Sequence, residues 1–149
     1  MDGFLETRHD KFIFRVKEGC FYNREDFWAD VQGNIATVGV TDFLQQIRGD
    51  VAFLETVEEG SAVIQGQEMG KIETIKVTFG IISPVTGAII EVNPQLDSSP
   101  YLINEDPYGE GWIYKIEMRD FEGDKGELLQ AEAYLELMKA KIEQEAKKK

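Results

Sequence analysis

The sequence of 149 residues has few of the residues on which much enzyme chemistry depends. It contains one histidine, His9, and one cysteine, Cys20. A single cysteine cannot form an internal disulfide, which favours a reducing compartment such as the cytoplasm. Neither residue has the partners that nucleophilic catalysis requires. We therefore expect His9 to lie on the surface and Cys20 to be a small buried residue rather than a redox partner.

Motifs for metal and phosphate chemistry are also missing. The chain has no HExxH, CxxC or calcium-loop pattern, so we predict no metal site. Residues 66–72 (GQEMGKI) resemble a phosphate-binding loop, but the segment is one residue short and ends in isoleucine where a hydroxyl is required. We predict that the chain is not an enzyme and that it serves other enzymes as a substrate or carrier.

Positive charge is scarce. Sixteen Lys and Arg residues against 28 Asp and Glu residues give a net charge of −12. Residues 139–149 hold five lysines against two glutamates, so residues 1–138 carry a net charge of −15. Such a surface repels phosphate backbones, which predicts no nucleic-acid partner. The acidic charge serves either solubility or docking on a basic protein, and both interpretations stay open here.

Long apolar runs are absent as well. No run approaches the roughly 20 residues that span a bilayer, and the N-terminus lacks the apolar core of a signal peptide. The length suits one domain. We expect residues 1–149 to form a single cytoplasmic domain with no membrane partner, and residues 145–149 to form a frayed basic tail.

Short runs of β-branched and aromatic residues dominate the chain and predict a mainly β fold. By propensity alone, residues 71–82 (KIETIKVTFGII) form one long strand with Lys76 in its middle. Residues 93–111, with three prolines, predict an extended loop. Residues 12–16 and 27–31 begin with short aromatic and β-branched runs, and the first convincing strand is 34–40. The other expected strands cover 51–55, 88–92 and 112–118.

Two helices are expected among these strands. Thr41 as an N-cap and Gly49 as a left-handed C-cap predict a short helix near 41–48. Apolar residues at three- and four-residue steps predict an amphipathic helix near 126–144. Its apolar stripe should dock on the sheet, with pairing to another chain as the alternative. Closely spaced strands with few helices favour a small sandwich or barrel.

Three segments resemble the H-protein family of the glycine cleavage system, a family of lipoyl carriers. They are residues 36–55 (ATVGVTDFLQQIRGDVAFLE), 82–93 (ISPVTGAIIEVN) and 104–112 (NEDPYGEGW). Residues 1–20 lie outside this resemblance and form an N-terminal extension. The resemblance implies a flattened lipoyl-domain-type sandwich of two small antiparallel sheets, also described as a barrel-sandwich hybrid.

The resemblance also implies the cofactor and its site. It places residues 73–77 (ETIKV) on the lipoylation motif, with lipoic acid joined by an amide to Lys76. Lys76 would then lie at an exposed hairpin turn, and its ε-amine would lose its charge. Glu73 matches the glutamate that the lipoylating enzyme recognises. Residues 104–112 either line the resting groove of the lipoyl arm or hold a loop in place.

Four partners are implied in the same way. A lipoate ligase or lipoyl transferase would attach the arm. Glycine decarboxylase would load an aminomethyl group, an aminomethyltransferase would unload it, and dihydrolipoyl dehydrogenase would reoxidise the dithiol. The chain would therefore shuttle an aminomethyl group and reducing equivalents between these enzymes.

Two departures from the family pattern favour other clients. The family usually has Glu-His-Glu-Trp where this chain has residues 25–28 (EDFW), and we expect the change to alter a partner-facing surface. The bulky, neutral run 77–82 should add apolar surface around the arm. One alternative is an H-like lipoate-binding protein that carries sulfur intermediates for a heterodisulfide-reductase-like sulfur-oxidation complex. A further alternative is an unmodified binding module.

Overall fold

The computed structural model describes residues 3–148, and most of its elements are antiparallel strands, as predicted. The strands are β1 (Phe4–His9), β2 (Phe12–Lys17), β3 (Phe21–Tyr22), β4 (Phe27–Gln32), β5 (Ile35–Val40), β6 (Val51–Thr56), β7 (Ala62–Val63), β8 (Glu68–Thr74), β9 (Thr78–Ile82), β10 (Gly87–Val92) and β11 (Tyr114–Met118). The helices are α1 (Asp42–Arg48), α2 (Leu102–Glu105), α3 (Phe121–Asp124) and α4 (Ala131–Lys147), and the 3₁₀ turns are η1 (Pro94–Leu96) and η2 (Lys125–Glu127). No helix within residues 3–148 is both long enough and apolar enough to cross a bilayer.

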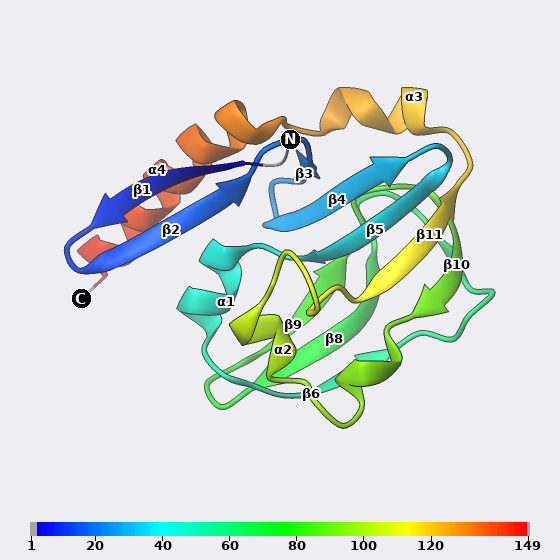
Figure 1. Ribbon diagram of the computed structural model, residues 1–149, viewed down its shortest axis with the longest axis horizontal. Coiled ribbons are helices and arrows are strands. Elements are labelled where there is room, and N and C mark those ends of the chain that lie inside the picture. Colours follow the sequence, from blue (N-terminus) through cyan, green and yellow to red (C-terminus); the bar gives the residue numbers. More distant parts are fainter. Residues whose placement is uncertain (1–2, 149) are drawn as a thin grey trace.

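The strands form two larger sheets and one separate hairpin (Figure 1). One sheet has the order β3-β4-β5-β11-β10-β7, and the other has the order β6-β8-β9. These two sheets face each other across a shared apolar core, which confirms the expected sandwich. Among the described residues, strands β1 and β2 pair only with each other, and they lie against α4. The sequence showed a β-branched and aromatic run at β2 but did not predict a third sheet formed with β1.

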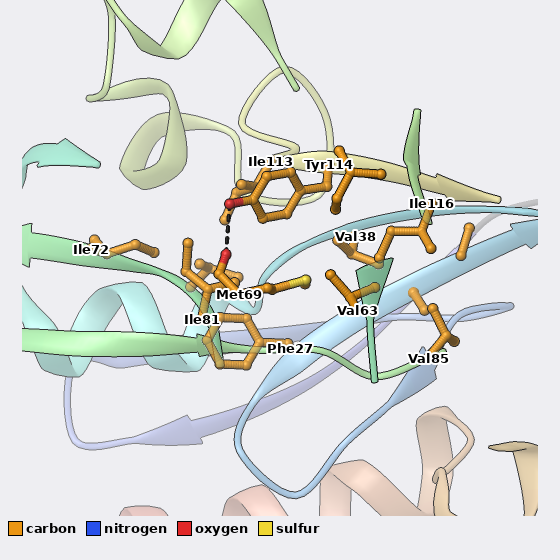
Figure 2. Packing of buried hydrophobic residues seen from close by; sticks show 14 of the residues in the cluster. Phe27, Val38, Val63, Met69, Ile72, Ile81, Val85, Ile113, Tyr114 and Ile116 are labelled. Atoms are coloured by element: carbon orange, nitrogen blue, oxygen red, sulfur yellow. Dashed lines mark hydrogen bonds between the residues drawn. The ribbon is translucent and has the colours of Figure 1, made fainter. Parts of the chain in front are cut away.

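A buried tyrosine links the two larger sheets. The hydroxyl of Tyr114 donates a hydrogen bond to the carbonyl oxygen of Met69 (2.6 Å; Figure 2) and accepts one from the backbone N–H of Val57 (3.0 Å). Burial raises the pKa of Tyr114, so the phenol keeps its proton. The next residue on β8, Gly70, has φ +115°, and a Cβ there would lie 2.9 Å from this hydroxyl. The close approach of the two sheets therefore requires glycine.

A second apolar cluster joins the two ends of the chain. The rings of Tyr22 on β3 and Tyr134 on α4 stack with their centroids 4.4 Å apart. The apolar stripe of α4 therefore docks within the chain, as expected, but against hairpin β1–β2 and β3. Cys20 is buried in this cluster. Its members are Phe14, Val16, Cys20, Tyr22, Trp28, Phe43, Ala131, Tyr134, Met138 and Ile142.

The expected bounds of the C-terminal helix were wrong. Helix α4 runs from Ala131 to Lys147 rather than over 126–144, so part of the expected frayed tail is helical. Residues 121–127 form the short elements α3 and η2 instead. The side chain of Asp120 accepts a hydrogen bond from the N–H of Gly123 and starts this separate turn.

Asp26 and Phe27 do not form the partner-facing surface that we expected. Phe27 is only 2% exposed and lies in the core between the sheets (Figure 2). Asp26 is 5% exposed and has a φ of +76°. Its carboxylate accepts hydrogen bonds from the Tyr134 hydroxyl (2.8 Å) and the Lys141 ammonium (2.9 Å). The replaced family residues therefore change the interior packing rather than an exposed surface.

Replacing Tyr134 with Phe should destabilise the protein. Burial raises the pKa of Tyr134 well above its usual value, so its hydroxyl remains a donor to the buried carboxylate of Asp26. The variant leaves that carboxylate short of one partner, and we expect the free energy of unfolding to fall by about 1–3 kcal/mol. Urea denaturation measures this change.

The control is Tyr101→Phe, because Tyr101 is 51% exposed. Its free energy of unfolding should change by less than about 0.5 kcal/mol. Equal effects of the two substitutions would contradict the structural role of the buried hydroxyl.

Candidate functional site

Lys76 lies at the tip of the hairpin formed by β8 and β9. Strand β8 ends at Thr74 and β9 begins at Thr78, so residues 75–77 form the turn. All three turn residues are exposed. The structure therefore places Lys76 at the exposed turn that the family resemblance implied, and the single long strand that propensity predicted was wrong.

The side chain of Thr74 explains why the chain turns here. Its Oγ1 accepts hydrogen bonds from the backbone N–H groups of Lys76 (3.2 Å) and Val77 (3.0 Å). The hydroxyl proton faces two carbonyl oxygens, those of Arg48 (2.8 Å) and Val77 (3.0 Å). A threonine hydroxyl thus satisfies backbone donors that a continuing strand would pair with a neighbour.

The C-terminal end of α1 supports the lysine side chain. Lys76 Nζ donates a hydrogen bond to the carbonyl oxygen of Ile47 (3.3 Å) in the last turn of the helix. The following C-cap residue, Gly49, has φ +95°, and a Cβ there would lie 3.0 Å from Lys76 Cδ. Glycine is therefore suited to this position both by its backbone conformation and by the lysine that passes over it.

Asn104 fixes the base of this arrangement. Its Nδ2 donates hydrogen bonds to Gln45 Oε1 (3.1 Å) and to the carbonyl oxygen of Gly49 (3.0 Å). Its Oδ1 accepts one from the backbone N–H of Val51 (2.9 Å). One side chain thus ties α2 to the end of α1 and the start of β6. Of the two roles left open for residues 104–112, holding the loop is the one that the structure supports.

The run 77–82 adds less apolar surface around Lys76 than the sequence suggested. Ile75 is 75% exposed and Val77 is 38% exposed. Further along the run, however, Ile81 is fully buried and Phe79 is partly buried against the core. Glu73 is exposed on β8, and its carboxylate makes no hydrogen bond or ion pair within the described residues 3–148. This carboxylate is therefore available to a partner protein.

A groove of about 410 Å³ opens beside Lys76. None of residues 104–112 lines it. Sequence reasoning missed this feature because its walls come from four separate parts of the chain. The lining residues are His9, Asp10, Phe12, Phe14, Phe43, Gln46, Ile47, Lys76, Ile142, Glu145 and Ala146.

Comparison with known proteins gives a consistent result. The family model described as glycine cleavage H-protein matches residues 20–141. The chain belongs to the glycine cleavage H-protein family. It is similar to a glycine cleavage system H protein of Thermus thermophilus, with 42% identity over 125 residues that cover 84% of this chain and 97% of the relative.

Two further relatives of the family support the assignment. A probable glycine cleavage system H protein of Pyrococcus abyssi is 41% identical over 128 residues, which cover 85% of this chain and 95% of that protein. The crystal structure of a glycine cleavage system H protein from Mycobacterium marinum superimposes with a TM-score of 0.71 at 32% identity, over 78% of this chain and 93% of that one. The family fold and the observed sandwich therefore agree.

Replacing Thr74 with Val should loosen the turn that presents Lys76. The valine keeps the β-branched shape but removes the acceptor for the N–H groups of Lys76 and Val77. We expect hydrogen exchange at these two amides to become about three- to tenfold faster. Exchange monitored by NMR measures the change.

Thr78→Val is the matched control, because Thr78 is an exposed residue at the start of β9. It should leave both exchange rates unchanged. If Thr74→Val had no effect either, the hydroxyl would not be what shapes the turn.

Proposed function

We propose that this chain is a cytoplasmic lipoyl carrier of the glycine cleavage system, with lipoic acid attached by an amide to Lys76. The observation that carries the proposal is the position of Lys76 at the exposed tip of a short hairpin in a chain of the H-protein family. A primary amine at such a tip can enter the active site of a modifying enzyme without unfolding of the sheet. A lysine in the middle of a paired strand could not.

The residues around Lys76 support attachment of a neutral acyl group. Thr74 fixes the backbone of the turn, and Gly49 leaves space for the lysine stem. Amide formation removes the charge of the ammonium. The exposed carboxylate of Glu73 is the contact that we assign to the lipoate ligase or lipoyl transferase. When attached, the lipoyl group supplies a disulfide that can open, carry an aminomethyl group and be reoxidised.

The chain itself would present the arm and catalyse none of the steps. Tethering keeps the arm at high local concentration near each docked enzyme. Glycine decarboxylase, an aminomethyltransferase and dihydrolipoyl dehydrogenase are the partners that we propose. The net charge of −15 over residues 1–138 supports docking on basic surfaces of these partners, because complementary charge speeds encounter.

Lys76 should be the single site of lipoylation. Incubation with lipoate ligase, ATP and lipoate should add one lipoyl group, and peptide mass mapping should place it on Lys76. Lys76→Arg should remain unmodified, because a guanidinium cannot replace the amine in forming the amide. The control Lys71→Arg changes another exposed lysine on the same hairpin and should be modified like the unaltered chain. Modification at another lysine would refute the assigned site.

The lipoylated protein should support exchange of carbon between glycine and bicarbonate by glycine decarboxylase, whereas Lys76→Arg should not. Isotope incorporation into glycine measures the rate over a series of carrier concentrations. If the carrier binds glycine decarboxylase only weakly, raising the carrier concentration should restore the exchange rate. A rate of zero at every concentration would exclude glycine decarboxylase as the client.

The exposed side chains of Ile75 and Val77 favour a second candidate function. A partner that docks on this neutral pair beside the arm would need a matching apolar surface. We retain an H-like carrier of sulfur intermediates for a heterodisulfide-reductase-like complex as that second candidate. Transfer of a sulfur intermediate from the lipoylated protein to such a complex, together with no glycine exchange, would favour it.

A further inference from the structure

Hairpin β1–β2 precedes residues 20–141, the range that the family model matches. Its two strands pair along their full length, with Glu6 opposite Arg15. Each strand therefore has an outer edge, at which every second residue turns its backbone N–H and C=O away from the other strand. Whatever these two edges bind is a property of this chain beyond the matched family unit.

The outer edge of β2 is paired with the rest of the molecule. The backbone N–H of Arg15 donates a hydrogen bond to Asp42 Oδ2 (2.9 Å), and its carbonyl oxygen accepts one from the Tyr108 hydroxyl (2.9 Å). Gln46 Nε2 donates a hydrogen bond to the carbonyl oxygen of Ile13 (2.9 Å). These contacts place the body of the protein on the β2 side of the hairpin.

The outer edge of β1 has no such contacts. Because the N–H of Arg15 points away from β1, its opposite residue Glu6 also turns its backbone groups outward, and so do Phe4 and Arg8 at two-residue steps. Within residues 3–148, no other segment hydrogen-bonds to these outward groups. Helix α4 packs on the face of the hairpin that carries Leu5 and so leaves this edge open. An unpaired strand edge is a template for another strand.

The charges along β1 are complementary to the same strand in a second copy. Glu6 and Arg8 are both exposed and lie two residues apart on one face. Antiparallel pairing centred on Thr7 would place Glu6 of each copy directly opposite Arg8 of the other, which gives two attractive pairs. Pairing centred on Glu6 or on Arg8 would instead oppose like charges.

The charge distribution of the whole chain also favours the hairpin as the contact between copies. Residues 1–20 contain four acidic and four basic residues, so this segment has no net charge, whereas residues 21–138 carry −15. Two copies therefore repel each other least when they meet through the hairpin.

We infer that this chain forms a symmetric dimer in which β1 pairs antiparallel with β1 of a second copy. The result is a four-stranded sheet in the order β2-β1-β1-β2, with one body beyond each β2. Six residues per strand make a small interface, so the dimer should be weak and should depend on protein concentration. This inference does not depend on lipoylation.

Sedimentation equilibrium of the full, unmodified chain tests the dimer. Between about 10 and 500 µM, the average mass should rise from 16.9 kDa toward twice that value. Glu6→Pro should raise the dissociation constant about tenfold or more, because it removes an outward N–H from each copy. The pairing with β2 does not use this N–H, so the melting temperature should stay near that of the unaltered chain. A monomer at every concentration, or dimerisation unaffected by Glu6→Pro, would overturn the inference.

Charge reversal tests the register. Arg8→Glu and Glu6→Arg should each weaken the dimer about tenfold, because each opposes like charges twice, and the double variant should restore the affinity to within about threefold. The control Arg119→Glu makes the same change in charge at an exposed site outside the hairpin and should leave the dissociation constant within about threefold. A double variant as weak as the single variants would refute pairing centred on Thr7.

Discussion

The hydrogen bond from the Tyr114 phenol to Met69 sets how the three-stranded sheet sits on the six-stranded sheet. The turn that carries Lys76 belongs to the smaller sheet, whereas α1 directly follows β5 of the larger one. Helix α1 leads from β5 of the larger sheet into β6 of the smaller one, so the relative position of the two sheets contributes to how Lys76 meets the end of α1. The buried phenol, with Gly70 allowing close approach, therefore helps to hold the sheet that carries the lysine in place.

Features encoded by neighbouring residues could be predicted from the sequence. Helix α1 follows from the Thr41 cap, the apolar spacing and Gly49, and its observed bounds are close to those expected. The turn at Lys76 could not be predicted from propensity, because its backbone donors are satisfied by the hydroxyl of Thr74 rather than by a turn-forming residue. Only the family resemblance placed the lysine correctly.

Features that depend on residues distant in sequence were predicted wrongly or missed. The buried carboxylate of Asp26 is paired with Lys141, and the two are 115 residues apart. The groove likewise needs β1–β2, α1 and α4 together. Nothing in the local pattern around residues 25–28 indicates which face of the sheet will be covered. The sequence therefore indicated Lys76 as the candidate attachment residue but not the surroundings that its side chain meets.

The N-terminal hairpin and helix α4 pack in one apolar cluster, so removing either end of the chain exposes that cluster. A fragment cut to the family-matched range, 20–141, would lose Phe14 and Val16 from one side of the second cluster and Ile142 from the other. The rings of Tyr22 and Trp28, which pack in the same cluster, would then become exposed to solvent. Contiguous apolar patches of this kind promote self-association. In this chain, the limits of the family match are therefore not the limits of the packed folding unit.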